Sequence, residues 1–524
     1  MAMATYKSTR AREDGENERA STFLDGRPAV TPVPYILAWY TGHDASVALV
    51  SPERIVHLEK ERFTRIRHDG GEVESLFAVA LEQAGISADD LVATARVAPD
   101  GDGKCWATTS PLEVECTERT VLGRTLPHYY LPHHLAHAAY AFYTSPCARA
   151  LVVTMDGGGD GRTTSAGPAM NDGLSGWAEH RFGEVREGWA LNYATAPSIG
   201  HEWNRLASEL FGDGGTYSAG KVMAVGGVAA ATFEEQTGFP IAVREQIQQL
   251  QQRTNKAVIA AVARHVPPHE QYDLVLGGGV MLNGLAVAAL LDSPVAPRRI
   301  HVPPAINDGG VSVGAGLYVL HALMHTPRQV FNPAAIAFCG YREPALDERP
   351  DIGAIVSALL ACQTVALVHG PAESGPRALG HRSLISVPSR QMKARLNAMK
   401  GRAAWRPCAP VVHVDDAPHW FQLIAADAYR FMTCICTYLT CGAAVPAAAL
   451  HDDGSARVQM VDDFSLFGAI LSALREEVGL PMMLLNTSLN AAGEAMPNTR
   501  EQALDTCQRL GVDVAFVGSE VVAP

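Results

Sequence analysis

The apolar positions of this chain fall into short runs with helical segments between them, which is the pattern of an α/β protein. The first runs are Tyr35–Tyr40, Ser46–Val50 and Ile55–Glu59, with a tight turn at residues 41–44 after the first. A further run, Leu151–Met155, reads as a buried strand. We therefore expect several strands that alternate with helices.

Three strand-like runs end in glycine-rich turns within about 160 residues of one another. Leu151–Met155 runs into Asp156–Gly161, and residues 274–276 run into residues 277–279. The third turn, Asn307–Gly310, opens a segment of small residues that could pack a helix closely. Glycines let backbone N–H groups approach phosphate oxygens, so Gly157 and Gly158 are candidate nucleotide contacts.

Length and composition predict more than one domain in this 524-residue chain. Residues 1–34 are polar and lack the apolar core of a signal peptide, so we expect a disordered tail. The pattern is interrupted between residues 332 and 350, which places a boundary near 341 and gives domains 35–340 and 341–524.

The charge and cysteine content exclude some classes of function. A formal net charge of −13 argues against a general nucleic-acid binder. No apolar stretch is long enough to span a membrane, and the cysteines lack the spacing of a disulfide framework. We expect a cytoplasmic protein that is a monomer or a homodimer.

The run from His133 to His137 is the most informative motif. The two histidines are four residues apart, so on a helix they share one face and form a pair of potential metal ligands. Such a pair also occurs by coincidence on helix surfaces. Because the strand that ends at Asp156 follows closely, the sequence proposes a metal and a nucleotide side by side.

The second domain collects cations beside glycine and proline. Arg377 and Arg382 flank one glycine turn, and further cations follow at Lys400, Arg402, Arg406 and Arg457. Fixed loops hold a guanidinium for two-pronged oxyanion binding, although charge runs often form solvated faces. Asn486, Ser488 and Asn490 end a buried strand, where they either bind a ligand or cap a turn.

Together these strings resemble the bacterial O-carbamoyltransferases of antibiotic, toxin and nodulation-factor biosynthesis, over nearly the whole chain. The matching strings include Gly42–Ser46, Glu59–Arg65, His133–His137, Asp156–Gly161, Ser218–Met223, Gly277–Asn283, Asn307–Gly310, Gly375–Ile385, Arg406–Pro410, His451–Gln459 and Asn486–Glu494. The resemblance implies an actin-like ATPase (Kae-type) domain followed by a YrdC-like α/β domain. Strand, tight turn, strand, strand is also how an actin-like domain begins.

The resemblance also implies roles for individual residues. His133, His137, Asp156 and Asp308 would hold a metal, iron(II) by analogy, although this ligand set also suits manganese or zinc. ATP, with its magnesium, and carbamoyl phosphate would be co-substrates. The implied nucleotide or carbamoyl phosphate contacts are Gly157, Gly158, Lys221, Gly278, Asn283, Asn307, Arg406, Asn486, Ser488 and Asn490.

These implications give a two-step reaction. Arg377, Lys400, Arg402 and Arg457 would assist formation of a carbamoyl-adenylate in the second domain. In the first domain the carbamoyl group would pass to a hydroxyl of a small natural-product acceptor, with His43 either as the base or as a substrate ligand. We expect the acceptor to contact residues 162–215.

Two other interpretations stay open from the sequence. One is a threonylcarbamoyl-type tRNA-modifying enzyme with the same folds, which the negative charge and the fusion of both modules disfavour. The other is a catalytically inactive actin-like nucleotide-binding scaffold. The presence of the potential metal ligands and of the arginines of the second domain disfavours it.

Overall fold

The computed structural model describes residues 33–97, 114–159, 162–170, 173–174, 178–179, 198–212, 218–266, 271–423, 425–438 and 447–523. Nearly all of the expected polar tail and much of the expected acceptor region, residues 162–215, lie outside these ranges. Contacts group residues 34–524 into one compact unit.

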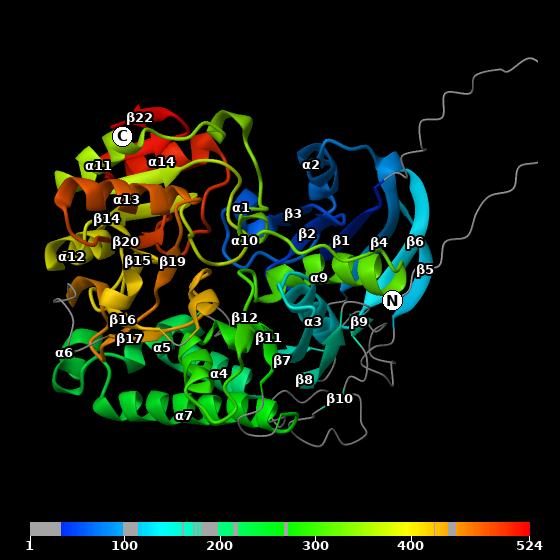
Figure 1. Ribbon diagram of the computed structural model, residues 1–524, viewed down its shortest axis with the longest axis horizontal. Helices are drawn as coiled ribbons and strands as arrows, with labels where there is room; N and C mark the ends of the chain where they lie inside the picture. Colours follow the sequence, from blue (N-terminus) through cyan, green and yellow to red (C-terminus); the bar gives the residue numbers. More distant parts are fainter. Residues whose placement is uncertain are drawn as a thin grey trace, which may run out of the picture. The chain divides into compact units, whose positions relative to one another are not determined.

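The first sheet has the strand order β3-β2-β1-β4-β6-β5 (Figure 1). Strands β1, β2 and β3 pair antiparallel, whereas β4 pairs parallel to both β1 and β6. The strands are β1 (Tyr35–Tyr40), β2 (Ser46–Val50), β3 (Ile55–Glu59), β4 (Leu91–Val97), β5 (Glu115–Val121) and β6 (Arg124–Leu131). The opening runs of the sequence are therefore strands, as predicted, and β3 lies at one edge.

The second sheet has the order β10-β8-β7-β11-β12, with β9 paired to β8. Its strands are β7 (Arg149–Gly159), β8 (Arg162–Met170), β9 (Gly173–Leu174), β10 (Ala178–Glu179), β11 (Asp273–Gly277) and β12 (Arg299–His301). Strands β7, β11 and β12 are parallel, and Gly277 at the end of β11 pairs with Thr154, two residues before Asp156 of β7. The turn expected directly after Asp156 is wrong: β7 continues to Gly159 through an irregular register after Met155.

Two helices, α3 (His133–Tyr143) and α9 (Val311–Tyr318), pack closely against each other next to these sheets. Helix α3 is buried along its whole length, and α9 crosses it. A Cβ on Gly314 would lie 1.9 Å from the carbonyl oxygen of Ala136, so only glycine permits this crossing. The prediction that small residues after residue 310 pack a helix closely is confirmed.

The remaining helices of residues 60–340 cover the sheets or lie beside them (Figure 1). They are α1 (Lys60–Thr64), α2 (Ser75–Ala84), α4 (Ile199–Phe211), α5 (Ala219–Gly226), α6 (Phe233–Thr237), α7 (Ile241–Ala263), α8 (Gly284–Leu291) and α10 (Pro333–Ala337). Helix α10 lies within residues 332–350, where the sequence indicates only a linker.

A third sheet follows in the order β19-β15-β20-β14-β13-β21-β22, and a small one in the order β16-β17-β18. The strands are β13 (Val365–Val368), β14 (Arg382–Ser386), β15 (Ala409–His413), β16 (Phe421–Gln422), β17 (Cys436–Tyr438), β18 (Ser455–Ala456), β19 (Gln459–Val461), β20 (Met483–Ser488), β21 (Val514–Val517) and β22 (Glu520–Val522). Helices α11 (Ile352–Leu360), α12 (Arg390–Met399), α13 (Leu466–Val478) and α14 (Arg500–Leu510) accompany them. The predicted α/β class is confirmed.

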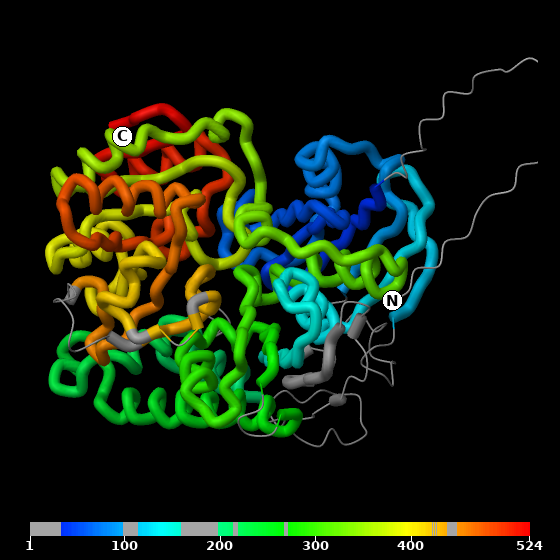
Figure 2. The backbone as a smooth tube through the Cα atoms, viewed as in Figure 1, coloured from blue at the N-terminus to red at the C-terminus, as the bar shows by residue number. Residues whose placement is uncertain are grey.

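The largest hydrophobic core is continuous across residue 340. It includes Val287 and Leu290 of α8 together with Cys434 and Ala448 of the later part. In Figure 2 the green tube of α4–α8 runs beside the yellow and orange tube of β16–β18. The division into modules 35–340 and 341–524 stays a prediction, and the two modules share one core.

Candidate active site

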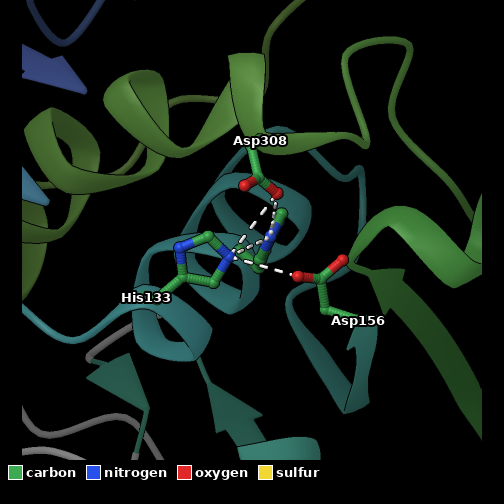
Figure 3. Close-up of side chains that lie close together, drawn as sticks. His133, Asp156 and Asp308 are labelled. Atoms are coloured by element: carbon green, nitrogen blue, oxygen red, sulfur yellow. Dashed lines mark hydrogen bonds and ion pairs between the residues drawn. The ribbon is translucent and has the colours of Figure 1, made fainter. Parts of the chain in front are cut away.

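Four potential metal ligands converge from three elements. His133 and His137 lie on the first two turns of α3, Asp156 lies on β7, and Asp308 begins the turn that leads into α9. All four are buried, and one ligand atom of each lies within 4.8 Å of the others. Figure 3 shows Asp156 and Asp308 pointing at His133 from two sides. The structure thus brings together the residues that the sequence named as metal ligands.

The distances within this cluster fit one cation. The two imidazole Nε2 atoms are 3.0 Å apart, and Asp308 Oδ1 lies 3.3 Å from His137 Nε2. His133 Nε2 lies 3.4 Å from Asp156 Oδ2 and 3.5 Å from Asp308 Oδ1. Neighbouring ligands of an ion with bonds of about 2.1 Å are roughly 3.0 to 3.5 Å apart. The residues therefore fit iron(II), manganese or zinc by type and by spacing.

The second oxygen of each carboxylate is held by another group. Gly279 N–H donates to Asp156 Oδ1 over 2.9 Å, and Tyr40 O–H donates to Asp308 Oδ2 over 2.9 Å. Gly278 makes the first contact possible: its φ is +89°, and a Cβ there would meet the carbonyl oxygen of Met155 at 2.2 Å. Such outer contacts orient ligands toward a metal. Gly278 thus shapes the cluster through backbone geometry.

The charges within the cluster stabilise one another. Burial lowers the pKa of His133, but Asp308 and Asp156 outweigh it and raise this pKa well above its usual value. Burial raises the pKa of Asp308, but His133 and His43 outweigh it and hold this pKa well below its usual value. Opposite charges in a dry site have this effect.

His43 lies between two carboxylates. Its Nδ1 is 3.2 Å from Asp44 Oδ2, and its Nε2 is 3.3 Å from Asp308 Oδ2. Asp308 and the contact with Asp44 raise the pKa of His43 to about 9 against the effect of burial. The side chain is 44% exposed, so a substrate can reach it. Its role as base or substrate ligand stays a prediction.

The cations of the later part line three adjoining cavities. The first, of about 200 Å³, is lined by Arg377, Arg402, Arg406, Arg457, Asn486 and Ser488. The second, of about 270 Å³, adds Gly157, Lys221 and Asn283 to Arg377, Arg406 and Arg457. The third, of about 430 Å³, adds Asn307, Lys400 and Asn490 to Arg377, Arg402 and Arg406. Arg377 and Arg406 line all three, so the cavities meet at these side chains.

Among the residues that the structure describes, several of these cations have no carboxylate partner, although acids such as Glu494 line the third cavity. Within the described part of the chain, no ion pair joins Arg377, Arg406 or Arg457 to an acid. Burial, with repulsion from Arg457 and Arg67, lowers the pKa of Arg377 well below its usual value. Burial lowers the pKa of Arg457 to about 10. Clustered cations with no acidic partner form a site that favours an anionic ligand.

Lys400 is held by the end of β20. Its ammonium donates to the Ser488 carbonyl and to Asn490 Oδ1, the latter over 2.8 Å. Burial, with repulsion from Arg402, lowers the pKa of Lys400 well below its usual value. Asn486 Oδ1 is buried with no hydrogen-bond partner in the described structure, so it is available to a ligand donor.

Some of the predicted contact residues have structural partners or lie outside the cavities. Asn283 caps α8 through Ala286 N–H and pairs its amide with Gln251. Arg382, which the sequence groups with Arg377, is fully buried and donates to five backbone carbonyls around it. Gly158 and Gly278 line none of the three cavities.

Other lining residues are absent from the sequence-based set. Arg67 and His68 follow α1 and line both the second and the third cavity. Met223 of α5 lines the first and second cavities. The nearest signal for Arg67 in the sequence was the motif Glu59–Arg65, which ends two residues before it. These residues show that the cation cavities are walled by both parts of the chain.

Comparison with known proteins shows what part of the chain is similar to. Residues 356–523 match the model of the carbamoyltransferase C-terminus. The carboxy-terminal third of this protein is therefore similar to the carboxy-terminal part of carbamoyltransferases. The resemblance inferred from the sequence is confirmed.

Two curated relatives extend the comparison. The nodulation protein NolNO of Sinorhizobium fredii is 26% identical over 92% of this chain and 79% of its own length. A 3′-hydroxymethylcephem-O-carbamoyltransferase of Amycolatopsis lactamdurans is 32% identical over 42% of this chain and 43% of its own length.

The solved structures show only distant likeness. An activator of 2-hydroxyisocaproyl-CoA dehydratase from Clostridium difficile matches 54% of this chain and 93% of its own, with 12% identity and a TM-score of 0.33. Full-length HypF matches 33% of this chain and 21% of its own, with 17% identity and a TM-score of 0.25. Within the described ranges, no helix is long and apolar enough to cross a membrane.

Proposed function

We propose that this protein is an ATP-dependent O-carbamoyltransferase that forms a carbamoyl-adenylate and passes its carbamoyl group to an alcohol. The observation that carries the proposal is the meeting of three cation-lined cavities at Arg377 and Arg406, beside a cluster of four metal-type ligands. The cation cavities suit a step in which anionic substrates are activated, and the metal-type cluster suits a transfer step. The names of the relatives support carbamoyl transfer to a natural-product hydroxyl.

The activation step belongs to the arginine cavities. Water releases carbamate and phosphate from carbamoyl phosphate, and a carbamate oxygen attacks the α-phosphorus of ATP. A C–O–P anhydride forms and diphosphate leaves. Arg377, Arg406 and Arg457 would neutralise the phosphate charge that builds up, while Asn486 and Lys400 orient the carbamate or nucleotide.

The transfer step belongs to the cluster on α3. The acceptor oxygen attacks the carbamoyl carbon, the bond from that carbon to the phosphate oxygen breaks, and AMP leaves. His43, whose protonated form the neighbouring carboxylates favour, would hydrogen-bond the acceptor as a substrate ligand, or would take the proton of its hydroxyl when the imidazole is neutral. A metal held by His133, His137, Asp156 and Asp308 would supply Lewis-acid polarisation of a carbonyl or phosphate oxygen.

The intermediate would pass between the sites inside the protein. The second cavity is lined both by Gly157 and Gly279, which neighbour Asp156 of the metal-type cluster, and by Arg377 and Arg457. A carbamoyl-adenylate is a mixed anhydride that water destroys, so an enclosed path protects it.

Diphosphate–ATP exchange tests the activation step without an acceptor. We expect labelled diphosphate to enter ATP only when carbamoyl phosphate or carbamate is present. Exchange that requires threonine and bicarbonate instead would move the chain to the tRNA-modifying class. No exchange with either would favour the inactive scaffold.

Isotope dilution tests the enclosed path. Labelled carbamoyl phosphate and ATP are incubated with a probe acceptor, 3′-hydroxymethylcephem, and with excess unlabelled carbamoyl-adenylate. We expect the product to keep nearly its full specific radioactivity. Dilution to the value of the mixed pool would show that the intermediate leaves the protein.

A further inference from the structure

A buried histidine of the edge strand β3 joins the two sites. His57 is 1% exposed, and its ring lies between two loops that are distant in sequence. Nε2 is 2.7 Å from the carbonyl oxygen of Gly309, and Nδ1 is 2.7 Å from Ser374 Oγ. Gly309 directly follows Asp308 of the metal-type cluster, and Ser374 lies three residues before Arg377 of the cation cavities.

The chemistry of the partners fixes the direction of both hydrogen bonds. A carbonyl oxygen can only accept, so Nε2 carries the hydrogen and donates to Gly309. Burial lowers the pKa of His57 to about 4, so the ring is neutral at pH 7 and Nδ1 is an acceptor. Ser374 therefore donates its hydroxyl hydrogen to Nδ1. One imidazole thus satisfies one group on each loop.

Glu59, two residues further on and on the same face of β3, holds the second loop again. Its Oε2 accepts from Gly375 N–H over 3.1 Å and lies 3.3 Å from Arg62 Nη2. Arg62 donates in turn to the carbonyls of Gly375, over 2.7 Å, and Glu373, over 3.1 Å. Both charged side chains are buried, so these contacts are shielded from water.

The two loops also touch each other directly. Gly375 has a φ of +93°, and a Cβ there would lie 2.5 Å from the carbonyl oxygen of Pro304. The loop that carries Arg377 is therefore pressed against the loop that leads to Asp308, and β3 holds both. His57 itself lines none of the three cavities, so it does not touch a ligand there.

We propose that His57 is a positioning residue that fixes the spacing between the Arg377 loop and the Asp308 loop. The inference rests on the proposed function, because spacing matters to catalysis only if an intermediate passes between the sites. With the spacing held, the path stays closed to water. When it is released, each site keeps its own residues, but the adenylate is lost to hydrolysis.

The test replaces His57 in the full-length protein. His57→Phe keeps a ring of similar size but removes both hydrogen bonds. We expect carbamoyl-phosphate-dependent diphosphate–ATP exchange within about twofold of wild type, and an about tenfold rise in uncoupled conversion of ATP to AMP without acceptor. His57→Gln, whose amide can still donate to Gly309, should restore part of the coupling.

Hydrogen–deuterium exchange gives a readout that is independent of activity. Peptides that span residues 304–310 and 373–377 should exchange about tenfold faster in His57→Phe than in wild type. The matched control is His321→Phe, another buried histidine, whose Nδ1 donates to the Thr326 carbonyl and whose ring packs against Tyr143. It should lower overall stability without changing exchange in these two peptides or the coupling.

If His57→Phe does not fold, Ser374→Ala serves as the test, because it removes only the hydrogen bond between Ser374 and His57. An unchanged ratio of AMP formed to diphosphate exchanged in a folded His57 or Ser374 variant would overturn the inference. A wild-type protein without any carbamoyl-phosphate-dependent exchange would overturn the proposed function instead, while the peptide measurement would still decide whether the bridge holds the loops.

Discussion

The metal-type cluster and the cation cavities solve opposite electrostatic problems. In the cluster, two imidazoles and two carboxylates lie within 4.8 Å and stabilise one another's charge. In the cavities, buried arginines repel one another, and burial lowers the pKa of Arg406 to about 10 with Arg402 adding to the effect. The cluster has the side chains that a cation needs, and the cavities have the charge that favours an anion.

This difference teaches how the two sites depend on their ligands. In the cluster the imidazoles partly balance the charge of the carboxylates. A bound cation would therefore enter a site whose ligands are already in place. Within the described residues, Arg377, Arg406 and Arg457 form no ion pair with an acid, so an anionic ligand would relieve the repulsion between them. Binding of the nucleotide should therefore stabilise the later part of the chain more than binding of a metal does.

Removing one carboxylate from the cluster should have the largest effect. Asp308→Ala should lose bound metal and lower transfer to the probe acceptor by about a thousandfold, because it removes a ligand and the partner of His43. Diphosphate–ATP exchange should stay within about threefold of wild type. Metal content is measured by elemental analysis beside both rates.

Asp273→Ala is the control for this prediction, because Asp273 pairs with the exposed Arg298 away from the cluster. It should keep both metal and transfer. Metal retained at the wild-type ratio in Asp308→Ala would exclude this ligand set.

Exchanging one guanidinium for an ammonium tests the cation cavities in the same way. Arg457→Lys keeps the charge but loses the planar fork, so diphosphate–ATP exchange should fall by about 10- to 100-fold. Transfer from supplied carbamoyl-adenylate should survive. Arg395→Lys is the control, because Arg395 pairs with Asp513 outside the cavities. Equal loss of both activities would place Arg457 outside the activation step.

Widening the crossing of α3 and α9 should act on the cluster through packing alone. Gly314→Ala forces a Cβ against the Ala136 carbonyl, so we expect a loss of about 3 kcal/mol in the free energy of unfolding and weaker metal binding. Urea unfolding and metal titration measure the two effects. Gly220→Ala, which has open space around its Cβ, should not lower the stability. A stable Gly314→Ala protein would contradict the close crossing.

The smallest effect concerns pH. Burial, with Arg328 adding to it, lowers the pKa of His301 from 6.5 to about 3 in the folded protein. The unfolded chain therefore binds the proton more tightly, and stability falls as the pH drops below about 6.5. The contribution of His301 between pH 7.5 and pH 5 is about 2 kcal/mol. His301→Gln should flatten the urea-unfolding profile by this amount, and an unchanged profile would show that His301 is protonated or exposed when folded.

The sequence predicted the cluster better than the cavities for a physical reason. His133 and His137 are placed by the period of one helix, and Asp156 ends a recognisable apolar run. Asp308, just before a glycine-rich turn, was instead assigned by the family resemblance. The cavities are walled by α5 and by Arg67, which are distant in sequence from Arg377, and no local pattern encodes that contact. The buried role of Arg382 was equally invisible, because it depends on carbonyls that only the fold brings together.

The most direct test of the account is exchange by metal-free protein. The protein is stripped with a chelator, dialysed, and supplied with magnesium, ATP, carbamoyl phosphate and labelled diphosphate. If the cavities activate and the cluster transfers, exchange stays within about twofold of the metal-loaded protein while transfer to the probe acceptor is lost. Exchange that disappears with the metal and returns when iron(II), manganese or zinc is added back would contradict the separation of the two sites.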